Sequence, residues 1–218
     1  MSSLVEQPEV LEQYTELRIQ DRLVLTSVIR ERQKNGSDRF DEVWNGVYVV
    51  SPLANNEHQS LVTQLAAVLS ASVQWASHGT VFAGVNVSDQ EEDWRQNYRV
   101  PDVAVFLNDT RATNQGTHWF GGPDFAVEIV SPNDRTREKL DFYASVGTRE
   151  LLIIDRDPWV LELYRLQNDQ LALVDRSTTD NGTPLVSDTV PLTFRLIAGE
   201  TRPNIDVVHK DGEPRWLI

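Results

Sequence analysis

Two acidic residues at the ends of consecutive apolar segments are the strongest candidates for chemistry. Asp102 opens "PDVAVFL", Pro101 to Leu107, and Glu128 lies late in "DFAVEIV", Asp124 to Val130. Both segments predict buried strands, because β-prone apolar residues run through them. An ionised carboxylate in such a strand costs several kcal/mol unless something pairs with it. We therefore expect Glu128 to hold a partner.

The partner is either a nearby arginine, such as Arg135 or Arg137, or a metal ion. If the two strands pair antiparallel, the start of the first lies near the end of the second, and Asp102 approaches Glu128. Two carboxylates forced together repel each other unless a cation intervenes. Mg²⁺ takes carboxylate and carbonyl oxygens plus waters. The pattern thus predicts a site for Mg²⁺ or Mn²⁺.

A lysine follows Glu128 by eleven residues. Lys139 falls on the first turns of a predicted helix, "RTREKLDFYASVG", which Asn133 or Asp134 can cap and Gly147 closes. A lysine there can neutralise phosphate charge or position an attacking water, although helix lysines are ordinarily surface residues. Tyr143 lies on the same helical face, where it is either a core residue or a site contact.

The upstream segments predict a hairpin and a long helix. "FDEVWNGVYVVSP" carries Asn45-Gly46, the strongest short hairpin signal, and its Glu42 is either an exposed acid or a site residue. "NNEHQSLVTQLAAVLSASVQWASHG" has apolar residues at helical spacing and is expected to end at Gly79. His58 falls on its inner face, as a structural residue or as a ligand.

The remaining segments complete a predicted α+β or α/β fold, a mixed central sheet flanked by helices. "LVLTSVIRERQKNG" predicts a helix ended by Gly36, and "TVFAGVNVS" a strand. Residues 108–123 are predicted to form a long loop. Strands are predicted for "ELLIID", "VLELYRL" and "LALVDR", and the last 40 residues are not assigned. We expect residues 36–218 to form one domain, preceded by a helical or extended segment, residues 1–35, that is a candidate dimer contact.

Composition limits the function classes. The chain has 218 residues, no cysteine and a formal net charge of −13. The absence of cysteine excludes disulfides and thiolate metal sites. The negative charge argues against a surface that coats nucleic acid, but it leaves room for a local site where a metal meets the phosphate. No apolar run long enough for a membrane span and no secretory signal are visible, so a cytoplasmic protein is expected.

Four segments in order, "RVPDVAVF", "FAVEIVSP", "REKLDFYASVG" and "RELLIIDRDPW", resemble the PD-(D/E)XK nuclease superfamily. More closely they resemble its Uma-two branch, to whose first hairpin and helix "FDEVWNGVYVVSP" and "EHQSLVTQL" are also similar. The resemblance covers roughly residues 40–165. It implies a restriction-endonuclease-like core and Mg²⁺-dependent hydrolysis of DNA phosphodiester bonds.

The resemblance also implies roles for individual residues. Asp102 matches the Asp of the PD element and Glu128 the acidic residue of the (D/E)XK element, so both would bind the metal, with the Ile129 carbonyl as a third ligand. Val130 stands where the superfamily usually has lysine, and Lys139 matches the helical lysine of the branch. Glu42 matches an acidic position of the first hairpin and would be an outer ligand.

Two rival functions stay open. A dimeric binding or regulatory module on an inactive nuclease core fits the acidic chain, because a fold does not fix a function. Another metal-dependent hydrolase with a small substrate is the second rival. A homodimer is the general expectation for a soluble chain of this kind.

Overall fold

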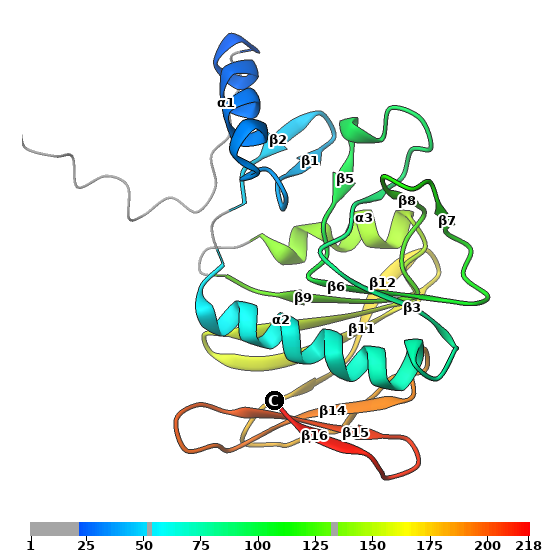
Figure 1. The fold of residues 1–218 in the computed structure, drawn as a ribbon. Coiled ribbons are helices and arrows are strands. Elements are labelled where there is room, and N and C mark those ends of the chain that lie inside the picture. Colours follow the sequence, from blue (N-terminus) through cyan, green and yellow to red (C-terminus); the bar gives the residue numbers. More distant parts are fainter. Residues whose placement is uncertain (1–21, 52–53, 132–134) are drawn as a thin grey trace, which may run out of the picture.

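The computed structural model describes residues 22–51, 54–131 and 135–218. Its centre is a six-stranded mixed sheet with the strand order β12-β11-β10-β9-β6-β3 (Figure 1). These strands are β3 Gly79–Ala83, β6 Val103–Leu107, β9 Phe125–Ile129, β10 Glu150–Arg156, β11 Trp159–Gln167 and β12 Gln170–Ser177. Strands β9 and β10 run parallel, whereas the other neighbours run antiparallel. The predicted mixed central sheet flanked by helices is confirmed.

The pairing of β6 with β9 brings the two candidate acids to one end of the sheet. The strands are antiparallel, with Val103 opposite Val127, so the condition on which the sequence argument depended is met. Asp102 directly precedes β6, and Glu128 is the last residue but one of β9. The acids therefore lie beside each other although they are far apart in the chain.

One face of the central sheet is covered by a helix and by a third sheet. The helix is α2 Asn56–Leu69, continued by a π-helical turn at Ser70–Gln74. The third sheet has the order β13-β14-β15-β16, with the bounds Leu185–Val186, Leu192–Ile197, Asn204–His209 and Arg215–Leu217. Both pack on the apolar side of β9, where Phe125 stacks on Phe194 at 5.8 Å between ring centroids. All four strands of this sheet lie within the last 40 residues, which the sequence left unassigned.

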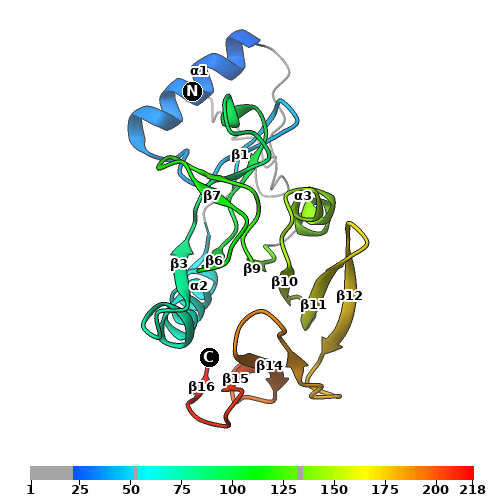
Figure 2. The same ribbon diagram turned by 90° about the vertical axis from the view of Figure 1, so that its right-hand side faces the viewer.

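The opposite face carries the helix that supplies Lys139. A 3-10 turn, Thr136–Lys139, leads into α3 Leu140–Ser145, which lies beside β9 and β10 (Figure 2). Phe142 and Tyr143 of α3 belong to the same buried cluster as Ala126. Gly147 follows with φ +81°, a left-handed end that favours glycine. The strand alternation that places Glu128 on the same face as Ala126 thus directs its side chain toward α3.

A second six-stranded sheet holds the hairpin, in the order β2-β1-β5-β4-β8-β7. Its strands are short: β1 Glu42–Trp44, β2 Val47–Val49, β4 Val87–Ser88, β5 Tyr98–Arg99, β7 Thr113–Asn114 and β8 Trp119–Phe120. Asn45 and Gly46 have φ of 49° and 82°, as the predicted tight hairpin turn requires. Helix α1, Arg22–Asn35, precedes the hairpin, and a 3-10 turn, Trp94–Gln96, precedes β5.

Three expectations about elements were wrong. The strand predicted over residues 80–88 divides at Gly84, whose φ of +65° turns the chain from the central sheet into the second one. The expected loop 108–123 contains β7 and β8. The long helix ends at Gln74, and Gly79 instead begins β3, where a Cβ would lie 2.4 Å from the Phe106 carbonyl oxygen.

Some predictions fall outside the described residues. Asn133 and Asp134, the proposed helix caps, lie there, and so does most of the proposed N-terminal segment, residues 1–21. Within the described ranges, no helix is both long and apolar enough to cross a lipid bilayer.

Candidate active site

Asp102 is held by one neighbouring strand and by one helix. Its Oδ2 accepts a hydrogen bond from the Ile129 backbone N–H at 2.7 Å, and its Oδ1 lies 2.8 Å from His58 Nε2. The Asn55 side chain accepts from the His58 N–H at 2.9 Å and caps α2, so the histidine is fixed at the first turn of the helix. The predicted inward orientation of His58 is confirmed, and its partner is the candidate acid itself.

Glu128 is 3% exposed and is held from α3 by two side chains. Tyr143 donates its hydroxyl to Oε1 at 2.5 Å, and Lys139 Nζ donates to Oε1 and Oε2 at 3.1 and 3.2 Å. Because Lys139 and Tyr143 are four residues apart, both point to the same side. Lys139 is 8% exposed, so it is not the surface lysine of the ordinary case.

The arginine partners considered for Glu128 form other ion pairs. Arg135 pairs with Glu138, and Arg137 pairs with Glu162 and Asp155 at 2.9 and 3.0 Å. The arginine alternative for Glu128 was therefore wrong, and its cationic partner in the structure is Lys139.

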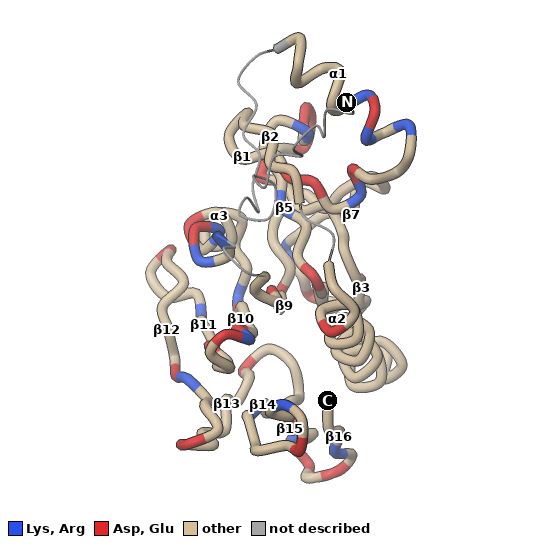
Figure 3. Tube along the Cα trace, turned by 90° about the vertical axis from the view of Figure 1, so that its left-hand side faces the viewer, with Lys and Arg blue, Asp and Glu red and all other residues tan. Residues whose placement is uncertain are grey.

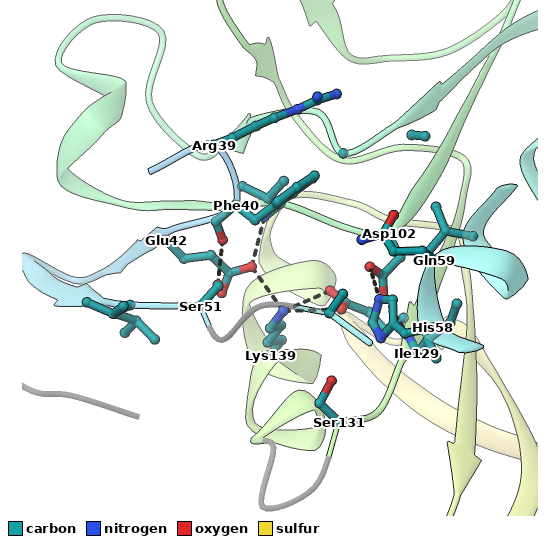
Figure 4. A pocket seen from close by; sticks show the side chains of 18 of the residues that line it. Arg39, Phe40, Glu42, Ser51, His58, Gln59, Asp102, Ile129, Ser131 and Lys139 are labelled. Carbon is teal, nitrogen blue, oxygen red and sulfur yellow. Dashed lines mark hydrogen bonds and ion pairs between the residues drawn. The ribbon is translucent and has the colours of Figure 1, made fainter. Parts of the chain in front are cut away.

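Glu42 joins the same cluster from the hairpin. Its Oε1 accepts from Lys139 Nζ at 2.9 Å and from the Val100 backbone N–H at 2.9 Å, while Oε2 accepts from Trp44 Nε1 at 2.6 Å. With 3% exposure it is not an exposed hairpin acid. Lys139 thus bridges an acid of the second sheet and an acid of the central sheet (Figure 4).

The charges of the cluster do not balance. Burial raises the pKa of Glu128 to about 8; the charge of Lys139 opposes this rise, and the charges of Asp102 and Glu42 add to it. Burial and the neighbouring Glu128 likewise raise the pKa of Tyr143 well above its ordinary value. Lys139 contacts two carboxyl groups, and the charge of Asp102 adds to theirs at Glu128, so a further positive charge beside Glu128 would lower its pKa.

Arg99 is a residue of this region that the sequence analysis missed. Its guanidinium lies between the rings of Trp44 and Phe142, at 4.6 and 4.2 Å from their centroids, and donates to the Val43 carbonyl at 2.9 Å. Burial lowers its pKa. It links the hairpin that carries Glu42 to the helix that carries Lys139. A lone arginine in "NYRVPD" carries no periodic signal that would have indicated this position.

The acids open into a cavity of about 550 Å³. Its walls come from the hairpin β1-β2, from helix α2 and from the chain at the ends of β3, β6 and β9. Figure 4 shows His58, Asp102 and Ile129 on one side and Glu42 on the other, with Lys139 between them.

The residues at this point fit a hard divalent cation. Asp102 and Glu128 supply carboxylate oxygens, which Mg²⁺ prefers. Burial is the main cause of the raised pKa of Glu128, the charges of Asp102 and Glu42 add to it, and a cation beside the acid would lower this pKa. Within the described residues no three His, Asp or Glu side chains are arranged to hold a metal by themselves. Two carboxylates with a carbonyl and waters are a usual Mg²⁺ set, so Ile129 remains the predicted third ligand.

Fold and comparisons define the class of protein. The mixed sheet with helices on its faces is a restriction-endonuclease-like α+β fold. It is similar to the solved structure of a putative nuclease belonging to DUF820 from Anabaena variabilis ATCC 29413, which is 20% identical, with a TM-score of 0.53. The match covers 68% of this chain and 83% of that one.

The family is shown by the sequence match. Residues 29–198, well over half of the chain, match the Uma2 family, described as "Putative restriction endonuclease", and the chain belongs to this family. No curated protein matches the chain. The family resemblance drawn from Asp102, Glu128 and their surrounding segments is confirmed.

Proposed function

We propose that the protein is a metal-dependent endonuclease that hydrolyses phosphodiester bonds of DNA. The observation that supports it most directly is the convergence of Asp102, Glu128 and Lys139 at one end of the central sheet. The description of the Uma2 family and the similarity to the Anabaena nuclease point to the same chemistry. Mg²⁺ or Mn²⁺, held by Asp102, Glu128 and the Ile129 carbonyl, would supply a Lewis acid that polarises the phosphate and activates water.

The chain's own groups prepare this site in three ways. The Ile129 N–H and His58 hold both oxygens of Asp102, which fixes the direction of the carboxylate. Tyr143 holds Oε1 of Glu128. Lys139 reaches the same cavity and can donate to a phosphate oxygen, so it compensates the charge that develops there. His58 and Tyr143 are thus positioning residues in this proposal, and Glu42 holds Lys139.

The low basic content of the chain limits how nucleic acid can bind. Acidic and basic residues are interspersed along the described trace (Figure 3). The formal net charge of −13 agrees with this distribution. Recognition therefore depends on the local site and its cation rather than on a basic surface.

A plasmid-nicking assay tests the proposal. Supercoiled DNA is incubated with Mg²⁺ or Mn²⁺ and with the wild type, Glu128→Gln or Lys139→Met. The matched controls are Glu213→Gln and Lys210→Met, which change exposed residues of the same types. We expect the wild type and both controls to nick the plasmid and both site variants to lose the activity. Cleavage by Glu128→Gln equal to that of the wild type would refute the assignment.

One observation favours the rival, a nuclease-fold binding module. Lys139 contacts both oxygens of Glu128, so the acid has a cationic partner without any metal. In that case the wild type would bind DNA without nicking it in either metal. The homodimer, the cytoplasmic location and the domain boundary after residue 35 remain predictions.

A further inference from the structure

The cavity beside the acids is larger than a metal ion and a phosphate need. Its volume of about 550 Å³ lies within the range of pockets that enclose a small organic group. Glu42, Asp102, Glu128 and Lys139 make up only part of its wall. The remaining space must therefore suit another part of the nucleotide that carries the scissile phosphate.

The rest of the wall is largely apolar. It includes Phe40, Val49, Val50, Val62, Ala83 and Val100. Phe40 stands at the mouth, 43% exposed, with its ring on the backbone of Gly84, where an added Cβ would lie 2.5 Å from Phe40 Cε1. Gly84 thus leaves the room that this ring position needs. An apolar wall with one exposed ring does not match a sugar-phosphate chain, but it matches the flat face of a base.

The basic side chains at the cavity are few, and each already contacts another side chain of the protein. Three basic residues line it, Arg39, Arg135 and Lys139, against three acids. Lys139 binds two of these acids, and Arg135 pairs with Glu138. Arg39 lies over the Phe40 ring at 5.1 Å. A duplex held along its backbone needs a row of cations, whereas an unpaired base binds mainly by stacking.

We propose that this cavity takes one unpaired base, stacked on Phe40, while the adjoining phosphate lies at Asp102 and Glu128. The inference rests on the proposed nuclease function and names its substrate: single-stranded or locally unpaired nucleic acid. Gln59 of α2 follows His58, which contacts Asp102, and lines the same cavity, so its amide can donate to and accept from a base edge (Figure 4). A paired, stacked nucleotide cannot enter without leaving its helix.

Binding to two forms of one DNA tests the inference without relying on cleavage. Fluorescence anisotropy of Glu128→Gln, without metal, is measured with labelled oligothymidylate of about 16 nucleotides and with the same strand paired to oligodeoxyadenylate. We expect the single strand to bind roughly tenfold more tightly than the duplex. Adding Phe40→Leu should weaken single-strand binding by about 5- to 100-fold and leave duplex binding unchanged, because one stacked base is lost.

Two further variants separate stacking from damage to the fold. Phe40→Tyr keeps an aromatic face and should keep the single-strand affinity, whereas Trp75→Leu changes an exposed ring outside the cavity and should alter neither affinity. Equal binding of both DNA forms, or single-strand binding unaffected by Phe40→Leu, would overturn the base pocket. If the wild type still nicks plasmid, the nuclease proposal survives that result; if no DNA is bound or cut, both proposals fall.

Discussion

Replacing Glu128 with glutamine should change how the stability of the protein depends on pH. Glutamine has nearly the same shape, and its oxygen can still accept from the Tyr143 hydroxyl, which lies 2.5 Å from Oε1 of Glu128. Lys139 keeps its contact with Glu42 at 2.9 Å. The substitution therefore removes the titrating group while the surrounding contacts stay in place.

The magnitude follows from the pKa of Glu128. Its ordinary value is 4.5, and burial raises it to about 8 in the folded protein. Between these values the folded state binds a proton that the unfolded state has released, so the free energy of unfolding falls as pH rises. The stabilisation is fully present below the ordinary pKa and is lost through about pH 8. At about 1.36 kcal/mol for each pH unit, the loss is on the order of 5 kcal/mol.

Urea denaturation with EDTA, between about pH 5 and about pH 9, measures this loss. Over this interval the free energy of unfolding of the wild type should fall by several kcal/mol more than that of Glu128→Gln. Glu213→Gln changes an exposed residue and should behave as the wild type does. Saturating Mn²⁺ should flatten the wild-type slope, because a cation beside Glu128 lowers its pKa. If the free energy of unfolding falls equally with pH in the wild type and in Glu128→Gln, the raised pKa of the buried Glu128 is refuted.

Three other substitutions test the contacts of the cluster in metal-free urea melts. Lys139→Met should cost about 3 kcal/mol, because Glu42 and Glu128 lose their shared ammonium; an unchanged midpoint would contradict the bridge. At about pH 9, above the pKa of Glu128, Tyr143→Phe should cost about 1.5–3 kcal/mol through the lost hydrogen bond to a charged acceptor, and a cost below about 0.5 kcal/mol would count against that bond. Trp44→Phe removes the indole N–H from Glu42 and leaves a smaller ring beneath Arg99, so it should cost at least about 1 kcal/mol. Circular dichroism is the suitable readout, and no loss would argue against the 2.6 Å contact.

Predictions from the sequence were accurate where local patterns determine geometry. The apolar runs around Asp102 and Glu128 are short and β-prone, and both form strands of the central sheet. Asn45-Gly46 carries the positive φ values that a tight hairpin needs. The helical spacing of Lys139 and Tyr143 correctly placed both on one face, where each contacts Glu128.

The errors concern interactions that depend on distant parts of the chain. Gly84 lies in an uninterrupted β-prone run, and only the presence of a second sheet explains why the strand divides there. Arg99 is buried between two rings that come from different elements, so no spacing around it indicates its role. The position of Glu42, which the sequence left open, likewise depends on Lys139, 97 residues away in the chain. Such long-range pairs become visible only in the folded structure.

Calorimetric titration with Mn²⁺ tests the central claim most directly, because it requires no assumption about the DNA. The account predicts that the wild type binds the metal and that Asp102→Ala abolishes the heat of binding, whereas Glu213→Gln binds as the wild type does. Asp102→Ala that binds Mn²⁺ as tightly as the wild type would contradict the claim that Asp102 and Glu128 form a metal site.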